Sequence, residues 1–247
     1  MALNAQTICT LARQIAKCPN YTTQSGEQLN LILQDLCQTY NLEINRATAT
    51  VQLSTGSSVG TVGLGSGPYL LPADYLRLAK DEAWYMVFGV PYVMVNVELS
   101  EFDALVQQAG ISNYPEQFAT DTSADAVTKY GAPVMYVWPP SGGNYLVNLR
   151  YWRQQPDILL PETNTTIPWF PNNNYLITRL AGELMKLTDD TRTNTYLGDG
   201  PDGAQGVLNR FLKLQVDDEG RAKTVTLDRR RFGRSFNRLP QTKTLGW

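Results

Sequence analysis

Hydrophobic residues recur with helical spacing in four stretches of the chain, residues 3–17, 25–40, 172–188 and 201–214. In each stretch, apolar side chains return every three or four residues, which places them on one face of an α-helix. Pro19 ends the first helix. Ser25 and Gln28 have the spacing of a capping box at the start of the second, and Pro201 suits the first turn of the fourth. The pattern predicts four amphipathic helices.

Between the second and third helices the period changes to two. Residues 47–53 alternate small or apolar side chains with Thr and Gln, and residues 68–98 are rich in Tyr, Val and Met. Residues 133–154 contain two runs of Val, Tyr and Trp on either side of Pro-Pro-Ser-Gly-Gly-Asn, which predicts a β-hairpin. Along its second run, one face carries Tyr145, Val147, Leu149 and Tyr151. A strand with one buried face has this alternation.

The remaining segments lack either period. Residues 54–67 are rich in Gly and Ser and predict a turning loop, and residues 113–129 are polar and predict a surface loop. Between them, Ser100 and Asp103 suggest caps of a short helix. Residues 156–171 contain four prolines, which predicts an extended segment on the surface.

Together these patterns predict an α+β fold, in which a helical bundle of about four helices packs with an antiparallel β-sheet and hairpin region. We expect residues 1–220 to form a single body with a β-rich insertion at 47–155. Residues 221–247 are predicted to form an extended basic tail.

Composition limits the chemistry that this chain can perform. Histidine is absent from all 247 residues, which excludes Ser-His-Asp and Cys-His catalytic sites and imidazole zinc sites. The three cysteines lack CxxC spacing and are expected to be reduced core residues. No apolar run approaches the ~20 residues of a membrane helix, and no signal peptide is recognisable, so we expect a cytoplasmic site of synthesis. We predict no catalytic residue, cofactor or metal, and no enzyme activity.

Two patterns in the sequence partly match ligand-binding motifs, one for dinucleotides and one for calcium. Residues 198–203 match G-x-G-x-x-G by letter, but a helix precedes them and Pro201 removes a backbone donor. A dinucleotide site needs a preceding strand, so a turn between helices is the better interpretation. Four aspartates lack the spacing of a calcium loop and are explained as helix caps, namely Asp189, Asp190, Asp199 and Asp202.

Charge is distributed unevenly along the chain. Residues 1–209 have a balance of −8 and residues 210–247 a balance of +6, within a net charge of −2. Large apolar residues are interspersed in the basic tail, including Phe232, Phe236 and Trp247. A solvated terminus has little use for such residues, whereas interfaces use them as anchors. The tail therefore suggests binding to an acidic protein surface or to DNA phosphate.

Several short segments in order along the chain resemble the head-to-tail adaptor (connector) proteins of short-tailed bacteriophages. They are Leu-Pro-Ala-Asp-Tyr at 71–75, Met-Tyr-Val-Trp-Pro-Pro at 135–140, the proline-rich stretch at 161–171, Leu-Ala-Gly-Glu-Leu-Met at 180–185 and Leu-Asp-Arg-Arg-Arg-Phe-Gly at 227–233. The resemblance implies a structural protein of the virion, made in the host cytoplasm. It also implies a homo-oligomeric ring of twelve copies at the head–tail junction, between the portal protein and a tail or nozzle protein, with transient contact to the viral DNA in its channel and no membrane contact.

On this interpretation the basic tail docks on the portal or on an adjacent subunit, through Arg229, Arg230, Arg231, Phe232, Arg234, Phe236, Arg238 and Trp247. The tip and polar face of the predicted hairpin are candidates for subunit or tail contacts, through Pro140, Gly142, Asn144 and Arg150. The alternative is a DNA-binding accessory module that grips phosphate with the basic C-terminal tail.

Overall fold

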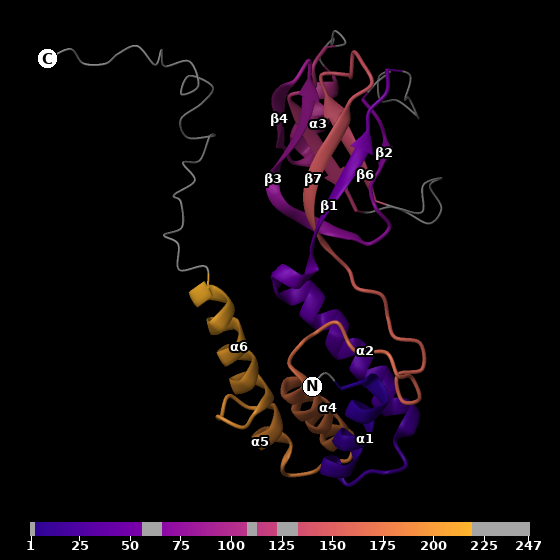
Figure 1. The fold of residues 1–247 in the computed structure, drawn as a ribbon, viewed down its shortest axis with the longest axis vertical. Coiled ribbons are helices and arrows are strands. Elements are labelled where there is room, and N and C mark those ends of the chain that lie inside the picture. The colour runs from indigo at the N-terminus through magenta and orange to yellow at the C-terminus, as the bar shows by residue number, and fades with distance from the viewer. Residues whose placement is uncertain (1–2, 56–65, 108–112, 123–132, 219–247) are drawn as a thin grey trace, which may run out of the picture.

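The computed structural model describes residues 3–55, 66–107, 113–122 and 133–218. This part of the chain folds as a helical lobe and a β lobe joined by a narrow neck (Figure 1). Its helices are α1 (Ala5–Ala16), α2 (Thr22–Thr39), α3 (Leu99–Val106), α4 (Asn173–Leu187), α5 (Thr193–Leu197) and α6 (Ala204–Asp218), with a 3₁₀ turn at Glu43–Asn45. Its strands are β1 (Arg46–Gln52), β2 (Tyr69–Leu70), β3 (Tyr75–Val87), β4 (Val90–Asn96), β5 (Gln117–Asp121), β6 (Val134–Trp138) and β7 (Leu146–Arg153).

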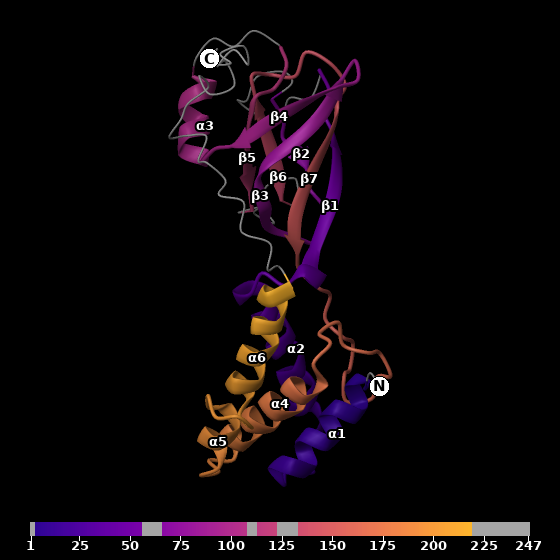
Figure 2. The ribbon, with the colours of Figure 1, turned by 60° about the vertical axis from the view of Figure 1, so that its left-hand side comes forward.

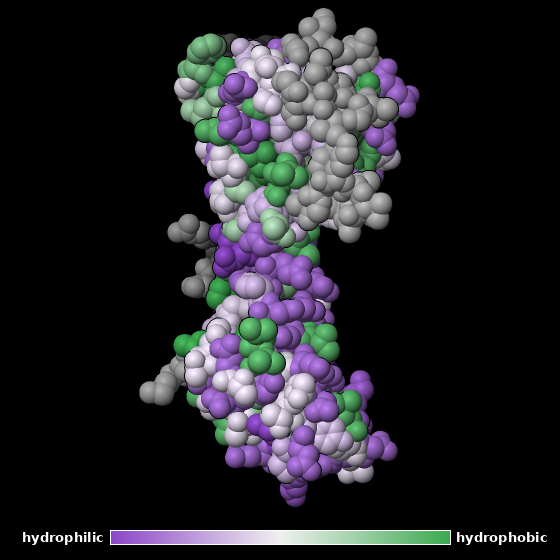
Figure 3. All heavy atoms as spheres, turned by 90° about the vertical axis from the view of Figure 1, so that its right-hand side faces the viewer, coloured by the Kyte–Doolittle hydropathy of each residue, from purple (hydrophilic) through white to green (hydrophobic). Residues whose placement is uncertain are grey.

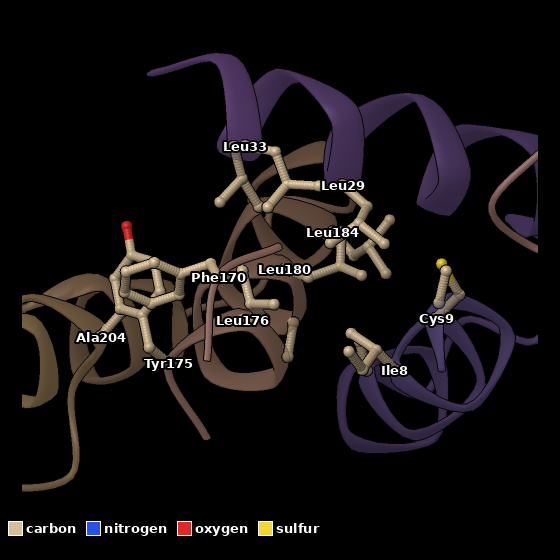
Figure 4. Packing of buried hydrophobic residues seen from close by; sticks show 14 of the residues in the cluster. Ile8, Cys9, Leu29, Leu33, Phe170, Tyr175, Leu176, Leu180, Leu184 and Ala204 are labelled. Carbon is tan, nitrogen blue, oxygen red and sulfur yellow. The ribbon is translucent and has the colours of Figure 1, made fainter. Parts of the chain in front are cut away.

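The helical lobe is built from α1, α2, α4, α5 and α6 around one hydrophobic core. Asn4 caps α1 by accepting the Thr7 N–H at 2.8 Å, and Asn172 caps α4 by accepting the Tyr175 N–H at 3.0 Å. Figure 4 shows the apolar faces of α1, α2 and α4 meeting, with Ile8, Leu29 and Leu180 pointing toward one another.

The predicted helices differ from the observed ones at their ends. α2 begins at Thr22, so Ser25 lies in its first turn and donates its hydroxyl to the Thr22 carbonyl at 2.6 Å; the predicted capping box is wrong. α6 begins at Ala204, after Pro201. The N-cap of α3 is Glu98, so neither Ser100 nor Asp103 caps it. The short α5 was not predicted.

Within the described residues, the β lobe is a curled sheet of seven strands in the order β1-β7-β3-β4-β5-β6-β2. Neighbouring strands run antiparallel except β4 and β5. The sheet curls until its two edges approach each other, and the Tyr69 hydroxyl on β2 donates to the Ser54 carbonyl beyond β1 at 2.9 Å. Figures 1 and 2 show the curled, barrel-like shape that results.

The predicted hairpin at residues 133–154 is wrong, although both of its strands exist. β6 pairs with β5 and β2, whereas β7 lies between β1 and β3. The connecting segment does not close a tight turn, because its backbone bonds to Asn113 instead: Asn113 N–H donates to Pro140 O, and Gly142 N–H donates to Asn113 O, both at 2.9 Å. The link therefore carries the chain from one wall of the curled sheet to another.

Two loop predictions also changed. The polar segment at 113–129 contains β5, whose Phe118 and Ala119 are fully buried. Within the proline-rich residues 156–171 there is no helix or strand, but the segment turns at residues 160–164 rather than running extended. We call residues 156–171 the strap. Thr166 O and Asn164 O accept from Ala5 and Gln6, which satisfies N–H groups that the first turn of α1 leaves free.

The helices were expected to pack around the sheet, and most of them do not. The cores of the two lobes share no residue, and in the described part of the chain α3 is the helix that packs on the sheet, with Phe102 and Tyr136 ring centroids 5.7 Å apart. At the neck, the Arg77 guanidinium donates to Gln38 O and Asn41 Oδ1, each at 2.7 Å. Hydrophilic residues cover the surface of the neck (Figure 3).

Candidate interaction surfaces

A cluster of exposed apolar side chains lies on the outer face of the β lobe, at the end far from the helical lobe. Alternation along β3 directs Tyr85 into the core and Trp84 outward, and Val93 on β4 lies opposite Trp84. We call this cluster the β-tip patch; it consists of Trp84, Met86, Phe88, Val93 and Leu146. α3 covers the sheet over β5 and β6 and leaves this part of the outer face open.

Phe88 is the most exposed member of the β-tip patch, with 97% of its surface accessible. It forms the two-residue turn between β3 and β4 with Gly89, and both residues have positive φ, 48° and 80°. Such turns favour Asn-Gly, because a bulky side chain is strained in the left-handed region. Neither burial nor turn geometry explains a phenylalanine at this position.

A second surface lies between α2 and the strap in the helical lobe. The Asn30 side chain holds the strap in both directions, since its amide donates to Ile158 O at 3.0 Å and its oxygen accepts from Ile158 N at 3.1 Å. Gln34 donates to both oxygens of Asp157. The crossing is close at Gly26, where a Cβ atom would collide with the Glu162 side chain.

This crossing leaves a groove of about 330 Å³, which we call the strap groove. Its apolar lining includes Leu159 and Leu160, which are 79% and 59% exposed. Its charged lining consists of Glu27, Asp157 and Glu162, and no Lys or Arg lines it among the described residues. Figure 3 shows hydrophobic residues breaking the polar surface on this side of the helical lobe.

The predicted contact residues of the β lobe lie in two places. Pro140 is buried, whereas Gly142 and Asn144 are exposed in the link between β6 and β7. Arg150 is exposed farther along β7, opposite Thr48 of β1, and does not join them. The predicted contact residues of the tail, from Arg229 to Trp247, lie outside the described residues.

The other sequence motifs have structural explanations. Gly198 ends α5, and Gly203 N–H donates to Gly200 O just before α6, so the G-x-G-x-x-G match is the predicted turn between helices.

No group of metal-binding side chains occurs in the described part of the chain. Cys9, Cys18 and Cys37 are buried as expected, and burial raises the pKa of the Cys9 thiol to about 11. Among the helices of the described residues, none has the length and apolar character to cross a membrane.

One ion pair perturbs an exposed carboxylate between α4 and α5. Asp190 Oδ2 lies 2.6 Å from Arg192 Nη2, and Asp190 Oδ1 accepts the Arg192 backbone N–H at 2.9 Å. These hydrogen bonds from Arg192 lower the pKa of Asp190 to about 2. They fix the turn between α4 and α5.

Neither the β-tip patch nor the strap groove was predicted from the sequence. A signal for the first exists: residues 83–95 are apolar at both odd and even positions, which is more than one buried face requires. The strap groove left no such signal, because it forms from α2 and a segment more than a hundred residues later.

Comparison with known proteins gives one family. A family model described as SU10 adaptor protein matches residues 3–231, which spans both lobes and the beginning of the basic tail. No curated protein matches the chain.

Proposed function

The chain belongs to the SU10 adaptor protein family, and we propose on this premise that it forms a homo-oligomeric ring of twelve copies at the head–tail junction of a virion. The ring joins the portal protein to a tail or nozzle protein and gives passage to the viral DNA. The observation that carries the proposal is the family match across residues 3–231. An adaptor is a structural protein, and we propose no enzymatic activity for it.

The shape of the chain supports an adaptor role. A ring of identical copies needs two different faces on each copy that complement each other. The helical lobe offers such a pair, because α6 and the strap lie on opposite sides of it (Figure 1). The β lobe adds a third surface at the opposite end of the molecule, where the β-tip patch is exposed.

We assign the contacts to the two ends of the molecule. The basic tail, from Arg229 to Trp247, docks on the portal or an adjacent subunit. The β lobe meets the tail components or a neighbouring subunit through the β-tip patch and the exposed residues Gly142, Asn144 and Arg150. An exposed apolar cluster on a soluble lobe is typical of a protein-binding site.

The test is attachment to isolated portal rings, measured by electron microscopy and co-sedimentation. The full chain should attach as a ring, whereas a chain lacking residues 229–247 should remain folded and fail to attach. Both lobes keep the core residues that the structure describes in that truncation, since the last of them packed on either core is Leu212. Failure of the full chain to attach, or unchanged attachment of the truncated chain, would count against the proposal.

The uneven charge favours one alternative, a DNA-binding accessory module. Residues 210–247 have a balance of +6, and neutralised phosphates make binding steeply dependent on salt. Duplex DNA titrated into the purified chain at two salt concentrations separates the two functions. Tight, salt-sensitive binding that disappears with residues 229–247 would favour the alternative.

A further inference from the structure

We infer that the strap groove is the docking site for the basic C-terminal segment, residues 219–247, of a neighbouring copy. The inference rests on the proposed ring, and the contact would join each subunit to the next one in that ring. The occupant is therefore a segment of this same chain, supplied by the next subunit.

The groove has the chemistry to bind such a segment. Glu27, Asp157 and Glu162 give it a negative lining, and none of the three is in an ion pair with a described residue. Leu159 and Leu160 expose apolar surface between these carboxylates. The Asn30 and Gln34 hydrogen bonds hold the strap on α2, so the groove is preformed.

The C-terminal segment carries the complementary chemistry. Residues 221–247 contain eight Lys or Arg and one acid, Asp228. Arg229, Arg230 and Arg231 precede Phe232, so positive charge and an aromatic anchor are adjacent in sequence. Arginine binds carboxylates with two donors, and aromatic residues supply most of the contact energy in small interfaces.

The geometry favours a neighbouring copy over the same chain. α6, which leads into the segment, runs along the side of the helical lobe opposite the strap in both ribbon views (Figures 1 and 2). In a ring whose interfaces use these two sides, the α6 side of one copy faces the strap side of the next. Residues 219–247 span at most about 95 Å when extended, which is ample to cross such an interface.

The first experiment detects the contact between two different chains. Tagged copies carrying Leu159→Cys are mixed with untagged copies carrying Phe236→Cys and oxidised. A covalent heterodimer is expected, and it can arise only between chains. The native cysteines are buried and contribute little background. Leu187→Cys, on an exposed leucine at the end of α4, is the matched control and should crosslink at least about fivefold less.

The second experiment exchanges the charges. Glu27→Arg with Glu162→Arg reverses the groove and keeps the Gln34–Asp157 hydrogen bonds, and Arg229→Glu, Arg230→Glu and Arg231→Glu reverse the segment. In the same crosslinking assay each reversal alone should lower the heterodimer yield by about fivefold or more, and the two together should restore it. Thermal melts of each variant establish that the fold is retained.

The outcomes separate this inference from the proposed function. Equal crosslinking at Leu187 and Leu159, or a groove reversal that the reversed segment does not rescue, overturns the inference. If the full chain then still attaches to portal rings, the adaptor role stands and the segment binds elsewhere. If the full chain does not attach, the adaptor role itself fails.

Discussion

The two lobes place their aromatic residues differently. In the helical lobe the aromatic side chains lie in or against the core, as Phe170 and Tyr175 do with ring centroids 5.3 Å apart. In the β lobe Tyr85 is buried, but its neighbours Trp84 and Phe88 are exposed. Among the described residues, the aromatic side chains with large exposed fractions, Trp84, Phe88 and Tyr92, are all in the β lobe.

The difference follows from the geometry of the elements. An amphipathic helix has one apolar stripe, and burying that stripe in a core leaves the polar face for solvent. A strand presents two faces, so a curled sheet encloses a core with one face and keeps the other free. In this chain α3 covers part of the free face, and the β-tip patch occupies another part. The β lobe therefore has room to display aromatic side chains on a face that its own core does not need.

The largest expected effect tests whether the two cores are separate. Leu176 is fully buried in the helical core, and Leu176→Ala should lower the free energy of unfolding of that lobe by about 3 kcal/mol. The β lobe should keep its stability, because none of the described residues belongs to both cores. Hydrogen exchange followed by mass spectrometry reports the two lobes separately.

Leu149→Ala, in the core of the β lobe, is the matched control and should give the converse result. Equal loss of protection in both lobes from either variant would show that the lobes unfold as one unit. The two lobes would then have separate cores but a shared stability.

A smaller effect distinguishes a binding role of the β-tip patch from a role in the stability of the β lobe. Phe88→Asn creates the Asn-Gly pair that a two-residue turn with positive φ prefers. We expect the β lobe to gain up to about 1 kcal/mol, because Asn tolerates the left-handed region better than Phe. Attachment of the chain to its tail-side partners should weaken at the same time. Chemical denaturation and co-sedimentation with tail components measure the two effects.

Leu146→Asn provides the control, since it removes another exposed side chain of the β-tip patch without changing the turn. It should weaken attachment with little change in stability. If Phe88→Asn attaches as well as the unchanged chain, the β-tip patch is not a contact surface.

The helices were predictable because each carries its information locally. The four-residue spacing of Leu176, Leu180 and Leu184 identifies α4 without reference to any other segment. The ends were less predictable, because they depend on competing hydrogen bonds. Ser25 and Gln28 have the spacing of a capping box, yet the Ser25 hydroxyl donates to Thr22 O inside the first turn of α2.

Strand pairing depends on residues far apart in sequence, and local patterns do not encode it. The alternation of Val147, Leu149 and Tyr151 identified β7 and its buried face correctly. Its partners are β1 (Arg46–Gln52) and β3 (Tyr75–Val87), both far earlier in the chain, and not β6, the strand that comes just before it. The backbone of Asn113 is hydrogen-bonded to the link between β6 and β7, and nothing in the local sequence predicts that contact.

The candidate surfaces were the least predictable part. The acidic groove needs Glu27 from α2 beside Glu162 from the strap, and nothing in either segment indicates that they meet. The basic tail was evident from composition alone, because its charge stands out from the rest of the chain.

The smallest expected effect concerns an ion pair on the surface of the helical lobe. The pKa of Asp190 is lowered to about 2 by its hydrogen bonds with Arg192, from an ordinary value of 3.8. A lowered pKa means that the folded state favours the carboxylate, so its stabilisation is complete above pH 3.8 and is lost as the pH falls toward 2. Asp190→Asn should remove this part of the acid sensitivity, measured by hydrogen exchange at the turn between α4 and α5. Asp189→Asn, which leaves the ion pair intact, should not. Because the pair is exposed, added salt should shrink the difference, whereas a salt-independent difference would mean that backbone capping by Asp190, and not its charge, holds the turn.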